Sequence, residues 1–162
     1  MRIGQGIDVH AFSEPGSASH IMLGGVEIPH DRGVVAHSDG DVLIHALMDA
    51  LLGALGLPDI GHQFPDSDPQ FSGANSMKLL ASVVGRMNEA ELYIENLDAT
   101  VLLEMPKLAA HREAMIQSIS QALGCDQGRV GLKATTTEKL GFIGRGEGIS
   151  AQVVVLLTSD PK

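Results

Sequence analysis

Residues 37–69 read HSDGDVLIHALMDALLGALGLPDIGHQFPDSDP, and their middle part is too apolar for a helix on the surface. From Val42 to Leu57 the only polar side chains are those of His45 and Asp49. A helix that is apolar on all sides is buried in a core or in a contact between subunits. The sequence therefore predicts a buried helix over this stretch, and the other elements are expected to pack around it.

A polar stripe runs along this helix. Asp41, His45 and Asp49 recur every four residues, which places them on one side of the helix. Burying a carboxylate or an imidazole without a partner costs roughly 1–3 kcal/mol or more. His45 and Asp49 therefore either pair with each other in the core or serve a metal site, and the helix alone leaves both interpretations open.

The composition argues against several classes of function. The 162 residues are 44% apolar, which is enough for one domain with a sizeable core. With no Trp, one Tyr and four Phe, the chain offers little for a platform on which several bases stack. A net charge of −9 argues against a surface that binds nucleic acid or an anionic membrane. An acidic protein can still hold a phosphorylated substrate through bound cations.

Cysteine content and the start of the chain point to a compartment. Cys125 is the only cysteine, which excludes an intrachain disulfide and fits a reducing compartment. We expect it to be an inert, buried thiol. The chain does not open on a basic and then apolar leader, and no uncharged run reaches the roughly 20 residues of a membrane span. These features predict a soluble, cytoplasmic protein of bacterial type without a leader or transit peptide.

Residues 1–12, MRIGQGIDVHAF, predict a strand. Asp8 and His10 project from one face of it, because residues i and i+2 of a strand share a side. A carboxylate and an imidazole placed in this way can bind one divalent ion, although such a pair is also common at the exposed end of a strand. Two glycines here begin a dinucleotide-binding pattern, but the third is missing, so we exclude a Rossmann fold.

The remaining elements alternate in type. His20 and His30, both expected on the surface, flank a second strand with a Gly24-Gly25 break, and we expect this strand to form a hairpin with the first. Further elements are a helix over 75–87, a strand over 93–103, a helix over 108–123, and strands over 129–135 and 149–158. The last strand has an apolar centre typical of burial on both faces.

This order predicts one α+β domain spanning residues 1–162, with an antiparallel or mixed sheet covered by helices on one face. An entirely apolar helix and a strand buried on both faces exceed what a monomer of this size easily covers. We therefore expect an oligomer.

Residues 135–148, TTTEKLGFIGRGEG, allow two interpretations. Thr135 and Glu138 have the spacing of a capping box at the start of a short helical turn. Three hydroxyls beside Glu138 and Lys139 also offer hydrogen-bond donors and a cation ligand to a phosphate. The spacing alone does not decide between them.

Asp8 and His10 on a strand and His45 on the buried helix together make a carboxylate and two imidazoles. This set suits zinc with a fourth position open to substrate, and an open position indicates catalysis. Asp49, one turn beyond His45, is a candidate to fix the tautomer of that imidazole.

Four segments together resemble the 2-C-methyl-D-erythritol 2,4-cyclodiphosphate synthase family. They are GQGIDVHAF (4–12), AHSDGDVLIHALMDALLGALGLPDIG (36–61), FPDSDP (64–69) and KATTTEKLGFIGRGEGI (133–149). The resemblance extends from Met1 to about Leu157. It implies a ferredoxin-like α+β sandwich, a homotrimer with active sites at subunit interfaces, and a role in non-mevalonate isoprenoid synthesis. The implied substrate is 4-diphosphocytidyl-2-C-methyl-D-erythritol 2-phosphate, which is cyclised with loss of CMP.

The resemblance also assigns roles to residues. The zinc ligands are Asp8, His10 and His45, and Glu138 is the ligand of a second divalent ion, Mg²⁺ or Mn²⁺, that bridges the substrate diphosphate. His37 and Ser38 contact substrate phosphate. The catalytic pair that stabilises the transition state is His37 and Thr136.

The implied substrate contacts include a strand segment, Asp8, Val9 and His10, and the threonine-rich segment Thr136, Thr137 and Glu138. A loop over the erythritol moiety comprises Asp59, Ile60, Gly61, Phe64, Pro65, Asp66, Ser67 and Asp68. A cytidine pocket comprises Leu103, Glu104, Met105, Pro106, Lys107, Leu108 and Ala109 with Thr135, Phe142 and Arg145. In the cytidine segment only Pro106 and Lys107 are typical of the family, and Glu104 places an acidic group near a nucleotide phosphate.

The implied chemistry needs no protein nucleophile. The 2-phosphate of the substrate attacks the β-phosphorus of its own diphosphate, and CMP leaves. Such a reaction asks the protein for positioning and charge neutralisation, which bound cations supply. The alternatives are a zinc phosphodiesterase or pyrophosphatase that activates water with the same ligands, and a non-enzymatic trimeric metal-binding module with a closed coordination sphere.

Overall fold

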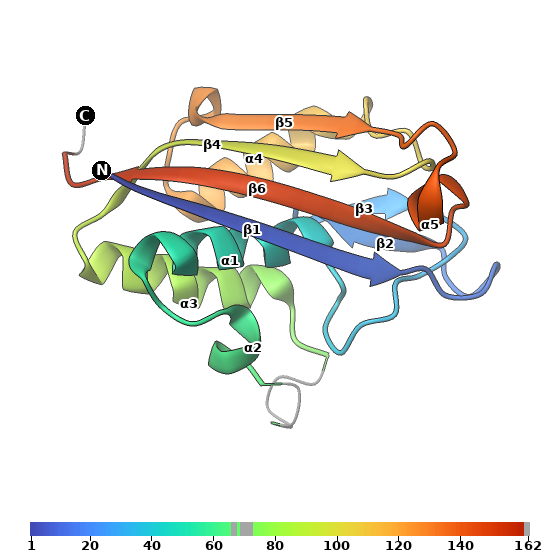
Figure 1. Cartoon of the computed structure of the whole chain (residues 1–162), viewed down its shortest axis with the longest axis horizontal. Coiled ribbons are helices and arrows are strands. Elements are labelled where there is room, and N and C mark those ends of the chain that lie inside the picture. Colours follow the sequence, from blue (N-terminus) through green and yellow to red (C-terminus); the bar gives the residue numbers. More distant parts are fainter. Residues whose placement is uncertain (66–67, 69–72, 161–162) are drawn as a thin grey trace.

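The computed structural model describes residues 1–65, 68 and 73–160. The described residues form a four-stranded sheet of order β1-β6-β4-β5, a separate two-stranded sheet, and helices (Figure 1). The elements are β1 (Arg2–Ala11), β2 (His20–Leu23), β3 (Val26–Pro29), α1 (Val42–Leu55), α2 (Ile60–Gln63), α3 (Ser76–Glu89), β4 (Tyr93–Leu102), α4 (Arg112–Leu123), the 3-10 turn η2 (Gln127–Arg129), β5 (Val130–Thr135), α5 (Gly141–Gly144) and β6 (Gly148–Thr158).

The larger sheet is mixed. β1 and β4 each pair antiparallel with β6, whereas β4 pairs parallel with β5. The parallel pair needs a crossover, and α4 provides it. The predicted α+β class with a mixed sheet is therefore confirmed. The ferredoxin-like detail is wrong, because that topology runs β-α-β-β-α-β and the strands of this sheet follow the order β-α-β-α-β-β.

Helix α1 lies directly on β1, and two glycines make this approach possible. A Cβ atom added at Gly4 would stand 1.9 Å from the carbonyl oxygen of Ala50, and one at Gly6 would stand 2.0 Å from that of Ala46. Any side chain at either position would push the helix away from the strand. The glycines that resemble the start of a dinucleotide loop are therefore packing residues.

The start of α1 is tied to the small sheet by Asp41. Its carboxylate accepts hydrogen bonds from the backbone nitrogens of Ile44 (3.1 Å), Gly24 (2.9 Å) and Gly25 (2.7 Å). Burial raises the pKa of Asp41 above its usual value, although these three hydrogen bonds act in the opposite direction. At the other end Gly56 takes a left-handed conformation, so the helix ends at Leu55, two residues before the predicted end.

The predicted opening hairpin is wrong. β1 pairs with β6 at the far end of the sequence, and β2 pairs with β3 instead. Gly24 and Gly25 form the two-residue turn between β2 and β3, with φ of 60° and 75°. Positive φ at both positions is typical of the tight turns that favour hairpins, and glycine adopts it without strain.

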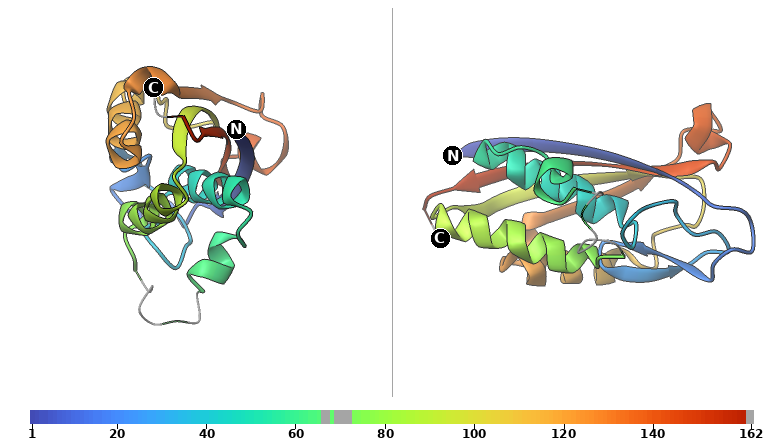
Figure 2. Two further views of the ribbon diagram at one scale, coloured as in Figure 1. Left: turned by 90° about the vertical axis from the view of Figure 1, so that its left-hand side faces the viewer. Right: turned by 90° about the horizontal axis from the view of Figure 1, so that it is seen from below.

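Helices cover one face of the sheet, as Figure 2 shows for α1, α3 and α4. The other face is open, and apolar side chains of β1 and β6 are exposed on it: Ile3, Ile7, Val9 and Val154 are 71%, 53%, 48% and 40% exposed. Within the chain, β6 is thus buried on one face only, which corrects the expectation of burial on both. In the described part of the chain, none of the helices has the length and apolarity needed to cross a membrane.

Candidate metal centre and active site

Asp8, His10 and His45 meet where β1 passes α1. Positions 8 and 10 continue the strand face that carries Gly4 and Gly6, so their side chains point toward the helix. Asp8 Oδ2 lies 3.0 Å from both His10 Nε2 and His45 Nδ1, and the two nitrogens are 3.1 Å apart. The side chains are only 10–23% exposed.

This triangle of atoms fits a metal ion. Ligand atoms of a tetrahedral zinc site, at bond lengths of about 2.0–2.1 Å, lie about 3.3 Å apart, close to the separations seen here. Among the described residues, no other group of three or more His, Cys, Asp or Glu side chains converges in this way. The predicted ligand set thus forms one cluster that could hold a metal.

Asp8 carries the negative charge of the cluster. Burial alone would raise its pKa, but the hydrogen bonds and charges of His10 and His45 outweigh that effect and hold the pKa of Asp8 well below its usual range. The carboxylate is therefore ionised at neutral pH, as a metal ligand must be.

The far side of the His45 ring contacts two hydroxyls. Nε2 lies 2.9 Å from Ser76 Oγ and 3.2 Å from Ser38 Oγ. Ser76, which is fully buried, donates from its hydroxyl to Asp39 Oδ1 and from its backbone nitrogen to Asp39 Oδ2 (3.0 Å). The sequence did not predict that Ser76 or Asp39 belongs to the site.

Asp49 does not serve His45. Its Oδ1 accepts a hydrogen bond from the backbone nitrogen of Ile60 at 2.8 Å and so anchors α2 to α1. Both predictions for this residue, a core pair with His45 and a partner that fixes its tautomer, are therefore wrong. Spacing of four residues placed the two side chains on one side of the helix, but packing with α2 and α3 decided their partners.

A cavity of about 310 Å³ opens beside the cluster. Its walls include the three cluster residues and five of the predicted substrate contacts: His37, Ser38, Ile60, Gly61 and Phe64. Asp59 caps α2 by accepting from the backbone nitrogen of His62 (3.0 Å), and its side chain pairs with that of His62. Val9 is directed to the open face of the sheet, away from this cavity.

The predictions for Asp66 and Ser67 lie outside the described residues. Pro65 is half-buried, and its carbonyl oxygen accepts a hydrogen bond from the backbone nitrogen of Asp68 at 2.9 Å.

The threonine-rich turn is held by Glu104. Glu104 Oε1 accepts from the backbone nitrogens of Thr137 (3.1 Å) and Lys139 (3.3 Å). Glu138 and Lys139 both have positive φ, at 53° and 64°, which is uncommon for residues other than glycine. The acidic group that stood out in the predicted cytidine segment is thus engaged with the backbone of this turn.

The capping-box interpretation is wrong. α5 begins after Leu140, and its N-terminus has no side-chain cap. Thr135 instead ends β5, and Thr136 Oγ1 donates to Glu138 Oε1 at 3.2 Å. The hydroxyl and the carboxylate that were expected to face a phosphate therefore lie together on an exposed turn.

A second cavity, of about 490 Å³, takes in part of the predicted cytidine segment. Its lining residues are Lys107, Leu108, Ala109, Arg112, Met115, Leu132, Lys133 and Ala134. The other predicted contacts there lie elsewhere: Leu103 is buried, Met105 is exposed, and Arg145 pairs with Glu147 at 2.8 Å.

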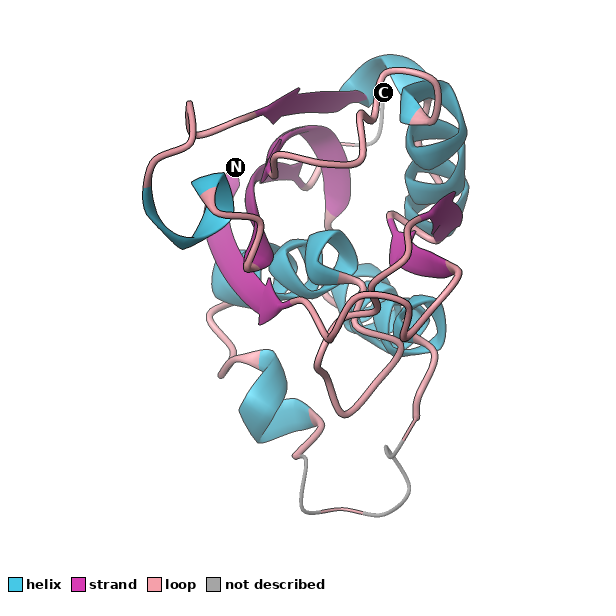
Figure 3. Ribbon diagram, turned by 90° about the vertical axis from the view of Figure 1, so that its right-hand side faces the viewer, coloured by secondary structure: helices cyan, strands magenta, loops and turns pink. Residues whose placement is uncertain are grey.

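The two halves of the candidate site share one end of the sheet. β1, β4 and β5 all finish there (Figure 1), and Figure 3 looks onto this end. β6 and β4 stand between β1 and β5, so His10 and Thr135 are separated by three strand spacings, or about 14 Å. Within one chain the metal cluster and the turn are therefore not in contact.

The sequence profile of the YgbB family matches residues 1–158. The chain belongs to the YgbB family. A relative from Alcanivorax borkumensis, named 2-C-methyl-D-erythritol 2,4-cyclodiphosphate synthase, is 58% identical over 98% of both chains. The bifunctional IspDF from Campylobacter jejuni is similar in structure, with a TM-score of 0.90 and 46% identity over 96% of this chain and 42% of that longer one. IspF from Plasmodium falciparum, solved as a CDP complex, has a TM-score of 0.84 and is 36% identical over 96% of this chain and 94% of that one.

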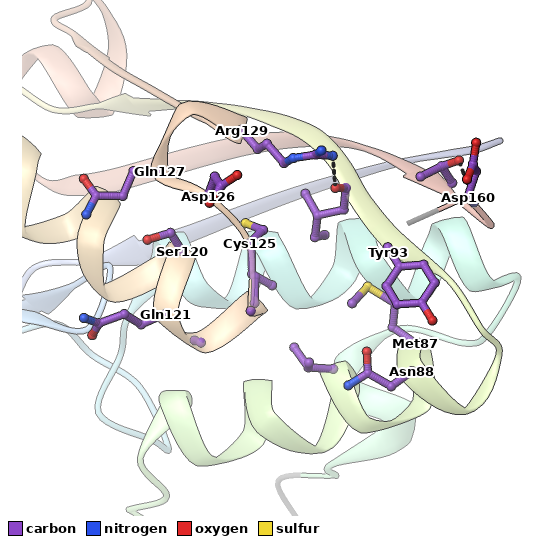
Figure 4. A pocket seen from close by; sticks show the side chains of 16 residues that line it. Met87, Asn88, Tyr93, Ser120, Gln121, Cys125, Asp126, Gln127, Arg129 and Asp160 are labelled. Atoms are coloured by element: carbon purple, nitrogen blue, oxygen red, sulfur yellow. Dashed lines mark hydrogen bonds between the residues drawn. The ribbon is translucent and has the colours of Figure 1, made fainter. Parts of the chain in front are cut away.

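A third cavity, of about 890 Å³, lies away from the metal cluster and the threonine-rich turn. It is lined by the ends of α3 and α4, the start of β4 and η2 (Figure 4). The Arg129 guanidinium at its wall donates to the carbonyl oxygen of Ile94 at 2.8 Å, and burial raises the pKa of the Cys125 thiol. None of the described residues predicted for the site lines this cavity.

Proposed function

We propose that this chain is a 2-C-methyl-D-erythritol 2,4-cyclodiphosphate synthase. It converts 4-diphosphocytidyl-2-C-methyl-D-erythritol 2-phosphate to the 2,4-cyclodiphosphate and CMP, which makes it a phosphorus-oxygen lyase of isoprenoid precursor synthesis. One observation carries the proposal. In a chain that matches named synthases over their whole length, the Asp8–His10–His45 cluster opens into the same cavity as His37 and Ser38.

We further propose that the cluster holds Zn²⁺ and that Glu138 holds Mg²⁺ or Mn²⁺. The carboxylate and two imidazoles suit zinc, and a lone carboxylate beside substrate phosphates suits a harder ion. Divalent ions at these places would neutralise the diphosphate and make its β-phosphorus more open to attack.

The protein's own groups have positioning roles in this proposal. His37 and Ser38 stand at the cavity wall and hold substrate phosphate, while Ile60, Gly61 and Phe64 cover the erythritol moiety. A 2-phosphate oxygen bonds to the β-phosphorus as the bond from that phosphorus to the CMP oxygen breaks. The Thr136 hydroxyl and the His37 imidazole stabilise the charge on the phosphoryl oxygens in the transition state.

We also propose a homotrimer with active sites at subunit interfaces, and two features support it. The open sheet face leaves Ile3, Ile7 and Val154 exposed, and such a patch is typical of a protein contact. In one chain, His10 of the metal cluster and Thr135, which leads into the turn of Thr136 and Glu138, are three strand spacings apart, or about 14 Å. We infer that the cluster of one subunit meets the turn and the cytidine pocket of another.

The other assignments belong to the same proposal. Residues 1–162 form one synthase domain that works in the cytoplasm and binds neither nucleic acid nor membranes. The family resemblance assigns the remaining predicted contacts to substrate. They are Asp8, Val9, Asp59, residues 103–109 and the other residues predicted for the cytidine pocket, up to Arg145.

Product mass in ¹⁸O-labelled water tests the reaction. Intramolecular attack predicts a cyclic diphosphate with no oxygen from water, released together with CMP. A linear product that carries ¹⁸O would show that water is the nucleophile, and would replace the proposal with a zinc phosphodiesterase or pyrophosphatase. Failure to turn over the substrate while zinc is bound would favour a non-enzymatic metal-binding module.

A further inference from the structure

The loop before α1 and the start of α3 close around the far side of His45. The backbone nitrogen of Gly73 donates to the carbonyl oxygen of His37 (2.8 Å), and that of Asp39 donates to Ala74 (3.2 Å). These bonds place Asp39 against the first residue of α3, Ser76, whose hydroxyl lies 2.9 Å from His45 Nε2. Three side chains from two segments distant in sequence therefore form a chain of contacts that ends at the metal cluster.

The direction of the hydrogen bonds in this chain follows from counting protons. A carboxylate only accepts, and a hydroxyl has one proton to donate. The Ser76 proton goes to Asp39, which also accepts from the Ser76 backbone nitrogen. Ser76 Oγ can then only accept from the ring, so His45 Nε2 must carry a hydrogen.

Ser38 offers the competing arrangement. Its hydroxyl lies 3.2 Å from Nε2 and could donate to a bare nitrogen. In that case the lone pair of Nε2 would face a lone pair of Ser76 Oγ at 2.9 Å, inside the buried end of the helix. We therefore reject the arrangement with a bare Nε2. The contact of Nε2 with Ser76 Oγ is shorter than that with Ser38 Oγ, and the Ser76 proton is already donated to Asp39.

We propose that Asp39 and Ser76 are positioning residues that hold His45 in its Nε2–H tautomer, and so direct the Nδ1 lone pair at the metal site. Nδ1 is the atom that faces Asp8 Oδ2 and His10 Nε2. The inference rests on the metal site of the proposed function, and it gives to Asp39 and Ser76 the role that the helix spacing had suggested for Asp49. Neither residue touches substrate in this account.

Two variants and one control separate this role from a purely structural one. Ser76→Ala removes the acceptor of the Nε2 hydrogen, while the cap of α3, Asn75, stays in place. Asp39→Asn keeps the shape but adds a donor, which lets the Ser76 proton turn toward Nε2. Ser82→Ala is the matched control, because Ser82 is an exposed serine on the same helix.

The first measurement is the imidazole ¹⁵N–¹H spectrum of the metal-free protein with Asp8→Ala and His10→Ala as the background, at a pH where imidazoles are neutral. The background is needed because, without a metal, the Asp8 carboxylate would itself accept a hydrogen from His45 Nδ1. The His45 signals are identified by their absence when His45→Ala is added. The background protein alone and with Ser82→Ala should show the Nε2–H tautomer, whereas adding Asp39→Asn or Ser76→Ala should shift it toward Nδ1–H. A background protein with hydrogen on Nδ1, or added variants that leave the tautomer unchanged, would overturn the relay.

The second measurement is zinc affinity, by competition with a chelator. Ser76→Ala and Asp39→Asn should bind Zn²⁺ about 10–100-fold more weakly, and Ser82→Ala as tightly as wild type. Unchanged affinity with lower thermal stability would mean a structural role only and would refute the proposal. If wild type itself binds no zinc, the metal site of the proposed function is wrong, and the tautomer spectrum still decides whether the relay exists.

Discussion

Asp8, His10 and His45 lie where the buried helix α1 packs against β1, whereas Thr136 and Glu138 lie on an exposed turn that the Glu104 carboxylate holds in place. The first group is fixed by glycines that let α1 touch β1, and by hydrogen bonds on both sides of the His45 ring. The second is fixed by Glu104, which accepts from the backbone nitrogens of Thr137 and Lys139 on either side of Glu138.

The difference between these two regions indicates where each is completed. The cluster has its three ligand atoms in place within a single chain, so a metal can bind without rearrangement. The turn presents one carboxylate and one hydroxyl to solvent, which is too little to hold a divalent ion alone. In the proposed function, the turn is therefore the part of the site that we expect substrate and a neighbouring subunit to complete.

Breaking the buried region should have the largest effect. His45→Ala removes one of three ligands, and we expect turnover to fall to background and bound zinc to be lost. The subunit assembly should survive, because the neighbouring residues of α1 remain buried. Activity assays, metal analysis and size measurement check this together, and a variant that keeps full zinc stoichiometry would disprove the ligand assignment.

Mixing subunits tests whether the two regions come from different chains. Inactive His45→Ala trimers and inactive Glu138→Ala trimers are exchanged in equal amounts. Each restored site needs an intact cluster on one side and an intact turn on the other, so about one site in four should recover. Labelled subunits verify that exchange has taken place. If subunits exchange and no activity returns, the two regions of each site come from the same subunit.

The same contrast explains how far the sequence could lead. Asp8, His10 and His45 were predictable because strand and helix periods place side chains on known faces. Asp39 and Ser76 were not, because their contact depends on how α3 packs 37 residues later in the chain. The pairing of β1 with β6 and the close approach allowed by Gly4 are long-range outcomes of the same kind, which local patterns do not encode.

A smaller effect is expected at the exposed turn. Thr136→Val removes a hydroxyl at nearly constant volume. If that hydroxyl bonds the phosphoryl oxygens more strongly in the transition state, kcat should fall on the order of 10²–10³-fold while KM changes little.

Steady-state kinetics and thermal unfolding decide the role of Thr136, with Thr158→Val at the end of β6 as the matched control. A Thr136→Val enzyme that is less stable but fully active would reduce the residue to a local structural role, since its hydroxyl also bonds Glu138.

The smallest effect is expected at Asp49, which borders the buried region but serves α2. Asn keeps the acceptor for the Ile60 nitrogen, so Asp49→Asn should change zinc affinity by less than the 10–100-fold expected for a residue that orients a ligand. Burial raises the pKa of Asp49, even though the hydrogen bond from Ile60 acts against it. A raised pKa in the folded state means that the stability contributed by the protonated form is present below the unfolded pKa and is lost as pH rises.

Asp49→Asn imitates the protonated form at every pH. At neutral pH the melting temperature of the variant should therefore be about 1–2 °C higher than that of wild type. The difference should vanish below the pKa of Asp49 in the unfolded state, near 3.8. Melting curves across that range measure it. A large loss of zinc affinity would return Asp49 to the metal site. A variant that is less stable at neutral pH would show instead that the charge of Asp49 strengthens the hydrogen bond from Ile60 by more than burial disfavours it.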